Sequence, residues 1–423
     1  MQLVIDESYV LFLCASMLYV HLDGGMHTQV HMLVCSLLWL IPGFICLSNC
    51  GLTSFLISGA SLLVQRVTRP RGGINEWLRW IPVSFHKKIN YVVKRVWGDS
   101  RFQTTVESNK VRPFSAEKSG LLEADPKQIA VMARESFEKE GPLLVIASGR
   151  DTIPVASTIR RLAPENVFVI QIQHPRSRLD RFDLVITPRH DYYPQTAHAQ
   201  GQIPWLLRRW ITPRDHPDSH VILTVGALHQ ADSTALKSAT FTWHDELAYL
   251  PKPLLVVNIG GPTSNCPYGD DLAKELITKL QNVMWSCGSL RISFSRRTPV
   301  RVSEMFVKEF RANSKVHIWD GEGPNPHMGH LAWADAFVVT ADSVSMLSEV
   351  CSTGKPVYVG GAERCKWKFA DFQNSLQERG AVRAFTGKED ISEIWSYPPL
   401  NDTAESAAQV HEALAKRGWK ICT

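Results

Sequence analysis

Three loops in the second half of the 423-residue chain carry residue types that could bind a phosphorylated ligand. In TADSVSMLSEVCSTGKPVYV, residues 340–359, Ser343 and Ser345 open a short predicted helix between two predicted strands. The first amides of a helix are unpaired and its dipole favours negative charge, so this position suits an anion. Glu349 lies four residues beyond Ser345 on the same helical face, where its carboxylate could accept hydrogen bonds from two sugar hydroxyls. A helix cap and a solvated helix face would explain the same residues without a ligand.

Two further loops place complementary groups at the ends of neighbouring predicted strands. Gly260 and Gly261 follow the strand in PKPLLVVNIGGP and permit a close approach of the backbone to a ligand. Arg296 and Arg297 in SRRTP supply paired guanidinium groups suited to a diphosphate. Helix caps and turn glycines explain each piece alone. In this order along an α/β chain, however, the three loops together favour a present or ancestral nucleotide-sugar pocket.

Other chemistries fit the sequence less well. The TGKP tetrapeptide lacks the upstream glycine of a P-loop and has Pro356 where a serine or threonine would bind magnesium. No G-x-S-x-G elbow and no H-E-x-x-H motif is present. We predict no metal site, because the histidines near the predicted strands lack ligand spacing and fit loop or core positions. These histidines are His174, His190, His229 and His244. SGRDT, residues 148–152, fits a second phosphate loop and a capped βα turn equally well.

Alternating strands and helices position these loops. The first half contains the apolar strands PLLVIAS, NVFVIQIQ, DLVITP and HVILTVGA. After the Pro-rich join YLPKPL the pattern restarts with PKPLLVVNIGGP, SLRISFSRRTP, KVHIWDG, AFVVTADS and PVYVGG. Such strands alternating with helices indicate parallel sheets that are covered on both faces. The predicted fold class is α/β, with two doubly wound, Rossmann-like domains that face a cleft, preceded by an atypical apolar N-terminal segment.

The predicted domain boundaries follow these shifts in pattern. Residues 1–65 form the atypical apolar N-terminal segment, which is uncharged from residue 24 onward. Residues 66–250 form the first Rossmann-like domain, and residues 251–423 form the second with a final helix. The chain is long enough for two separate cores. Its nine cysteines show no paired framework, so we predict reduced thiols of an intracellular protein.

Positive charge is concentrated where the first domain begins. The net charge is +5, and the segment from Arg66 to Arg95 holds eight lysines and arginines against Glu76 alone, which makes +7. This segment suits an anionic lipid surface or an acidic partner. The chain has no zinc-finger spacing, aromatic-rich RNA motif or basic heptad, so nucleic acid is not a predicted partner.

The N-terminal segment leaves several interpretations open. Residues 24–65 contain no Asp, Glu, Lys or Arg, and such a run is long enough to cross a bilayer once. The basic segment that follows would keep the rest of an integral membrane protein, anchored by residues 32–64, in the cytosol. The alternatives are a buried core segment and a non-standard N-terminus from a mis-assigned or alternative first exon. A cleaved signal peptide is not predicted, because residues 1–20 contain two acidic residues and no basic one.

Many stretches resemble the plant branch of the mitochondrial fission Elm-type family. They include VTRPRGGINEW, LLVIASGRDTI, IQHPRSRLDRFDLVITPRHDYYP, LTVGALHQ, SRRTP, NPHMGHLAWADAFVVTADSVSMLSEVCSTGKPVYV and WSYPPLNDTAE. The resemblance extends from about Arg66 to the C-terminus. It implies a fold like that of the two-domain B-type glycosyltransferases, in which residues 340–359 align with the segment that binds the nucleotide-sugar donor. It also implies a role on the cytosolic face of the mitochondrial outer membrane, helping to bring a dynamin-related GTPase to division sites. Residues 1–65 depart from the family, because they lack the strand, Gly-rich loop and helix that normally precede RVTRPRGG.

Two functions from different classes follow from the residues and the resemblance. The first is a non-catalytic adaptor on the mitochondrial surface, which needs no cofactor. The second is a glycosyltransferase that uses a nucleotide sugar, and its product would be a nucleoside diphosphate. In that enzyme Glu349, Arg296 and the Gly260–Gly261 loop would hold the donor. A base in the first domain, Asp151 or His174, would activate the acceptor.

Overall fold

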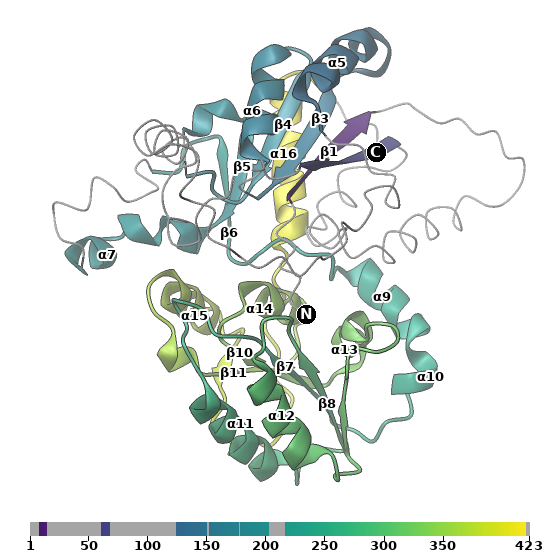
Figure 1. Cartoon of the computed structure of the whole chain (residues 1–423), viewed down its shortest axis with the longest axis vertical. Coiled ribbons are helices and arrows are strands. Elements are labelled where there is room, and N and C mark those ends of the chain that lie inside the picture. Colours follow the sequence, from purple (N-terminus) through teal and green to yellow (C-terminus); the bar gives the residue numbers. More distant parts are fainter. Residues whose placement is uncertain are drawn as a thin grey trace, which may run out of the picture.

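The computed structural model describes residues 8–14, 61–67, 124–149, 152–176, 178–202 and 216–419. These residues form two α/β lobes, one above the other in Figure 1, and each lobe is built on a six-stranded sheet. The predicted α/β fold class with two Rossmann-like domains is therefore confirmed.

Four parallel strands form the centre of the first sheet, whose strand order is β2-β1-β3-β4-β5-β6. They are β3 (Leu143–Ser148), β4 (Val167–Ile172), β5 (Leu184–Pro188) and β6 (Val221–Thr224). These strands are the apolar runs of the sequence, and every residue of β4 is buried. Complete burial is expected for a parallel strand that has both faces covered.

The N-terminal residues extend this sheet with antiparallel strands. β1 (Ser8–Cys14) pairs antiparallel with both β2 (Ser61–Val67) and β3. The first sheet is thus mixed, where the sequence predicts a parallel one. Apart from the first residues of β2, the predicted anchor, residues 32–64, lies outside the described residues. Within the described part of the chain, no helix combines the length and apolarity that crossing a bilayer requires.

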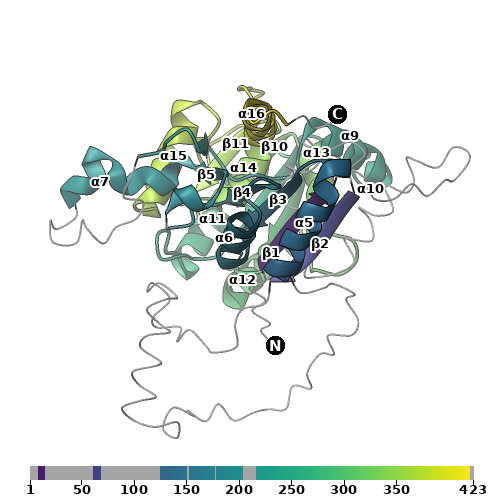
Figure 2. The same cartoon turned by 90° about the horizontal axis from the view of Figure 1, so that it is seen from above.

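Helices cover both faces of the first sheet, but one of them comes from the far end of the chain. α5 (Pro126–Glu140) and α6 (Ile153–Leu162) pack on one face. α16 (Asp402–Lys416) packs on the other face, and Figure 2 shows the sheet between them. This corrects the predicted placement of the final helix in the second domain. α5 and α6 bury only one face of the first sheet, so its other apolar face must be buried by another element. α16 buries it with Ala407, Val410 and Leu414.

The second sheet is wholly parallel, with the order β12-β11-β10-β7-β8-β9. Its strands are β7 (Leu254–Ile259), β8 (Ser289–Phe294), β9 (Val316–Ile318), β10 (Ala336–Thr340), β11 (Val357–Gly360) and β12 (Arg383–Ala384). The chain winds outward from β7 in one direction and from β10 in the other. This doubly wound order, which the sequence predicts, places a topological switch point between β7 and β10, where such sheets bind ligands.

Two groups of helices cover the second sheet. α11 (Asp270–Val283) and α12 (Val300–Phe310) pack on one face. α13 (His327–Trp333), α14 (Val344–Cys351) and α15 (Lys368–Glu378) pack on the other. α9 (Ser233–Thr242) and α10 (His244–Leu247) precede the predicted boundary at residue 250, yet α9 packs against α13. The chain therefore enters the second lobe before β7 begins.

A disulfide connects two loops of the second lobe. Cys266, after β7, pairs with Cys365, after β11, and their Cα atoms are 4.2 Å apart. The prediction that all cysteines are reduced is wrong for this pair. The two residues are 99 positions apart in the sequence, so their proximity depends on strand order and leaves no local pattern. Cys287 and Cys351 are buried free thiols.

Candidate ligand site at the domain junction

The carboxyl ends of β7 and β10 bring the predicted glycine loop against the start of α14. Gly260 donates its N–H to Thr340 Oγ1 at 2.7 Å, and Gly261 donates its N–H to Asp342 Oδ2 at 3.0 Å. The two strands are neighbours in the sheet, so the residues that follow them meet at one edge. The structure therefore places Gly260 and Gly261 beside the segment that contains Ser343.

Packing within the protein explains why both loop residues are glycines. A Cβ atom on Gly260 would overlap the carboxylate of Asp342, and one on Gly261 would overlap the backbone carbonyl of Arg297. Sequence reasoning attributes the glycines to the approach of a ligand. In the structure, the groups that approach are Asp342 and Arg297.

Asp342 is the residue of this edge that sequence reasoning missed. Its side chain is fully buried, and Oδ2 lies 3.2 Å from a guanidinium nitrogen of Arg297. Burial raises the pKa of this carboxyl group, while Thr340, Gly261 and Arg297 act in the opposite direction. The dipeptide Asp-Ser just before a short helix was the available signal.

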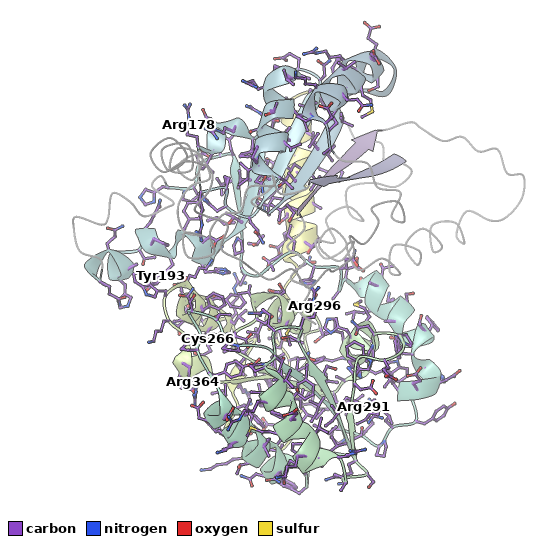
Figure 3. The ribbon with its side chains drawn as sticks, in the orientation of Figure 1. Arg178, Tyr193, Cys266, Arg291, Arg296 and Arg364 are labelled. Carbon is purple, nitrogen blue, oxygen red and sulfur yellow. A yellow bond between two sulfur atoms is a disulfide. The ribbon has the colours of Figure 1, made fainter. Side chains whose placement is uncertain are left out.

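The two predicted arginines have different surroundings. Arg297 pairs with Asp342, as described above, although half of its side chain remains exposed. Arg296 is exposed, and Figure 3 shows it on the side of the second lobe that faces the first. Within the described residues Arg296 forms no ion pair, so it is the arginine that can meet an anionic ligand.

Ser343 and Ser345 occupy different positions at the start of α14. Ser343 is the N-cap, and its Oγ accepts a hydrogen bond from the Met346 N–H at 3.4 Å. Ser345 lies in the first turn and is exposed. The cap interpretation of Ser343 is thus correct for its side chain. The other first-turn amides have no intrahelical partner, which leaves the anion-binding property of the helix start intact.

Glu349, the predicted sugar-binding carboxylate, is held by a histidine that opens α13. His327 Nε2 lies 2.8 Å from Glu349 Oε2, and the two side chains are 28% and 16% exposed, respectively. Burial opposes charge on both groups. Nevertheless, the carboxylate raises the pKa of His327, and the charge of His327 lowers the pKa of Glu349. The two residues are 22 positions apart on separate helices, so sequence reasoning did not connect them.

The remaining polar face of α14 is a contact between the domains. Ala227, after β6, donates its N–H to Ser348 Oγ at 2.9 Å. Ser352 Oγ donates to the Ala231 carbonyl at 3.0 Å. Gly226 must be a glycine here, because a Cβ atom would overlap the side chain of Ser348. This face is therefore covered by the first lobe, and the interpretation as a solvated face does not hold for it.

The N-terminus of α16 anchors the same loop of the first lobe. Asp402 Oδ1 accepts the Val225 N–H and Oδ2 accepts the Gly226 N–H, each at 2.8 Å. Thr403 Oγ1 accepts the His229 N–H at 3.2 Å and donates to the His229 carbonyl at 3.1 Å. The loop between Val225 and Ala231 is thus fixed from α14 on one side and α16 on the other.

The carboxyl edge of the first sheet carries one of the two predicted bases. His174 follows β4, its Nδ1 accepts the Arg176 N–H at 3.0 Å, and its ring packs edge-on against Tyr192. Burial lowers the pKa of His174, and Asp191 partly offsets this effect. Asp191 lies 2.7 Å from Lys368 Nζ of α15, so the carboxyl edges of both sheets face the domain junction.

The other predicted residues of the first lobe do not form a second site among the described residues. Asp151 lies outside the described residues. Thr152, the N-cap residue of α6, donates its Oγ1 to the carbonyls of Ser148 and Gly149, so its side chain does not cap the helix amides as the capped-turn interpretation requires. His190 and His229 are buried, whereas half of the His244 side chain is exposed. In the part of the chain that the structure describes, no three His, Cys, Asp or Glu side chains are placed to hold a metal ion.

A cavity of about 670 Å³ lies farther out along the second sheet, between α12 and the ends of β8 and β9. Its walls include Ser295 and Thr298, which flank the arginine pair, together with Phe294 and Trp319. None of Gly260, Ser343 and Glu349 lines it. The cavity adjoins the arginine loop but does not contain the groups that would bind a ribose.

Comparison with known proteins identifies relatives over most of the chain. A family model described as mitochondrial fission ELM1 matches residues 67–414. A protein named mitochondrial fission protein ELM1, from Arabidopsis thaliana, is 59% identical over 378 residues, which cover 88% of each chain. The uncharacterized protein RP120 from Rickettsia prowazekii (strain Madrid E) is 28% identical over 300 residues, or 67% of this chain and 83% of that protein.

Solved structures of enzymes that act on nucleotide sugars show a more distant likeness. A UDP-GlcNAc 2-epimerase from Methanocaldococcus jannaschii is 15% identical, with a TM-score of 0.44 over 69% of this chain and 82% of that one. A UDP-GlcNAc 2-epimerase from Neisseria meningitidis, bound to UDP-GlcNAc, is 14% identical, with a TM-score of 0.42 over 69% and 80%. A likeness of this size carries no information about activity.

Proposed function

The chain belongs to the mitochondrial fission ELM1 family, and we propose that it acts as a non-catalytic adaptor in mitochondrial division. In this role it works on the cytosolic face of the outer membrane and helps to recruit a dynamin-related GTPase to division sites. The observation that carries the proposal is the 59% identity with a plant fission protein over 88% of both chains. The basic segment from Arg66 to Arg95 suits attachment to an anionic membrane surface.

Two features of the second lobe support an adaptor over an enzyme. The groups that would hold a nucleotide sugar are partly occupied by the protein itself, since Arg297 pairs with Asp342 and Glu349 with His327. The lobe also exposes large apolar side chains, and such side chains mark a protein-binding surface where they gather into a patch. The most exposed are Phe241, Tyr249, Trp285, Val300 and Ile394.

Loss of the protein is expected to leave mitochondria long and connected, with less of the GTPase on their surface. Division requires assembly of the GTPase, so a lower amount at the membrane lets fusion dominate. Microscopy of mitochondrial length and quantification of surface-bound GTPase in knockout cells measure both effects. Re-expression of the full chain is the control and should restore both. Unchanged morphology and unchanged recruitment in the knockout would rule the adaptor out.

Binding of a nucleoside diphosphate or nucleotide sugar is a second candidate function. It is supported by the convergence of three groups at the switch point of the second sheet: the start of α14, Gly261 and the loop of Arg296. A diphosphate there would meet first-turn amides and an exposed guanidinium, and Glu349 would meet a ribose. Such charge-assisted hydrogen bonds are worth about 1.5–3 kcal/mol each. Binding without turnover would agree with an adaptor that senses a nucleotide.

Uridine diphosphate is expected to bind the full chain, and E349A and R296A are each expected to weaken it about tenfold, or about 1.4 kcal/mol. The first variant removes the acceptor for ribose hydroxyls and the second removes positive charge near the diphosphate. Calorimetric titration measures both affinities. R379A, at an exposed arginine beyond the end of α15, is a matched control that should bind normally. Wild-type affinity in E349A would show that Glu349 does not contact the ribose.

A further inference from the structure

His229 lies at the domain junction, in the loop after β6, and hydrogen bonds fix its position. Its backbone is held by Thr403, and its Nδ1 accepts the Ala231 N–H at 3.2 Å. The side chain is 5% exposed. Sequence reasoning treats this histidine as a loop or core residue, and no interaction described so far uses its second ring nitrogen.

That second nitrogen is a buried donor without an acceptor. Because Nδ1 accepts a hydrogen bond, the proton of the neutral ring is on Nε2. Burial lowers the pKa of His229, which keeps the ring neutral near pH 7. Nε2 is buried and has no hydrogen-bond partner among the described residues. A buried donor without an acceptor is destabilising, so its presence beside a candidate ligand site calls for an acceptor.

The donor lies across the junction from Glu349. The loop of His229 contacts α14 at Ser348 and at Ser352, and Glu349 directly follows the first of these serines. The carboxylate of Glu349 is the charge that most strongly raises the pKa of His229 against the effect of burial. His229 in turn contributes to the lowered pKa of Glu349. The two side chains are therefore electrostatic neighbours from different lobes.

Together these two groups match the chemistry of a ribose diol. A hydroxyl both donates and accepts, an ionised carboxylate only accepts, and the Nε2–H of a neutral histidine only donates. We propose that His229 completes the ribose end of the site from the first lobe, donating to a ribose hydroxyl oxygen while Glu349 accepts from the diol and His327 holds Glu349 in place. This inference rests on the nucleotide site proposed above. It adds that the nucleoside must contact both lobes at once.

Two substitutions of His229 separate its two nitrogens. In H229N the side-chain oxygen can replace Nδ1 as acceptor for the Ala231 N–H, but nothing replaces Nε2. In H229Q the longer amide can place a donor where Nε2 was. Affinities of the full chain are measured by calorimetry for uridine diphosphate, for its analogue without both ribose hydroxyls, and for inorganic pyrophosphate. H244N, at the half-exposed histidine of α10, is the control.

H229N is expected to bind uridine diphosphate about tenfold more weakly than the wild-type chain, a loss of about 1.4 kcal/mol, and to bind pyrophosphate unchanged. H229Q and H244N should bind both probes normally. The wild-type chain should bind the analogue without ribose hydroxyls at least tenfold more weakly than uridine diphosphate. The H229N substitution should not lower the affinity for this analogue any further. Melting temperatures identify a variant that has lost its fold. The affinities of the wild-type chain for the analogue and for uridine diphosphate test the ribose contact without any variant, so this test does not depend on the folding of a variant.

The outcomes distinguish the two proposals. If H229N binds uridine diphosphate as tightly as wild type, the role of His229 is overturned while the nucleotide site stands. The same conclusion follows if its affinity for pyrophosphate falls by the same factor as its affinity for uridine diphosphate. A dideoxy analogue that binds as tightly as uridine diphosphate overturns the ribose contact in the same way. If the wild-type chain binds neither uridine diphosphate nor pyrophosphate, the nucleotide site itself is wrong.

Discussion

Replacing Asp402 with alanine is expected to lower the free energy of unfolding by about 3 kcal/mol. One buried carboxylate accepts two backbone N–H groups, from Val225 and Gly226, and both bonds are 2.8 Å long. D402A leaves both donors without an acceptor, and each buried unsatisfied donor costs about 1–3 kcal/mol. The same loop contacts Ser348 and Ser352 at α14, so the substitution also loosens the contact between the two lobes.

Urea unfolding followed by circular dichroism measures this effect. D402N keeps one acceptor oxygen and is expected to lose less than D402A. D245A, at a fully exposed aspartate on α10, is the control and should change stability by less than about 0.5 kcal/mol. Equal stability of D402A and the wild-type chain would mean that water replaces the carboxylate, and the loop after β6 would then not depend on α16.

Gly261→Ala is the second substitution with a large expected effect, a loss of about 3 kcal/mol in the free energy of unfolding. The new Cβ atom would overlap the backbone carbonyl of Arg297, and backbone cannot turn aside as a flexible side chain can. The two loops must therefore separate. This breaks the hydrogen bond from Gly261 to Asp342 and shifts the loop that carries Arg296.

The same unfolding measurement and a nucleotide titration test this prediction. Affinity for uridine diphosphate should fall together with stability in G261A. Gly201→Ala, on α7 (Ala197–Gln202), is the matched control, because no atom lies within 4 Å of the position that the new methyl group would occupy. Its stability should stay equal or rise slightly, since alanine favours the helix over glycine. If G261A is as stable as the wild-type chain, the contact between Gly261 and Arg297 is not tight in solution.

Most of the secondary structure, and much of the location of the site, can be predicted from the sequence alone. The apolar runs that become β4, β7 and β10 are recognisable because burial on both faces requires apolar residues at every position. The proximity of Gly261 and Ser343 could also be anticipated. Both follow parallel strands, and the carboxyl ends of such strands meet at one edge of the sheet.

The partners of these residues, in contrast, become visible only in the folded chain. Local patterns indicate that Glu349 lies on a helical face, but they do not show that His327 from another helix holds it. They place His229 in a loop, but not beside Glu349, and they assign α16 to the wrong lobe. Asp402 and Val225 are 177 positions apart. Such contacts depend on strand order and on which sheet face lacks a cover, and both are settled by the packing of the whole chain.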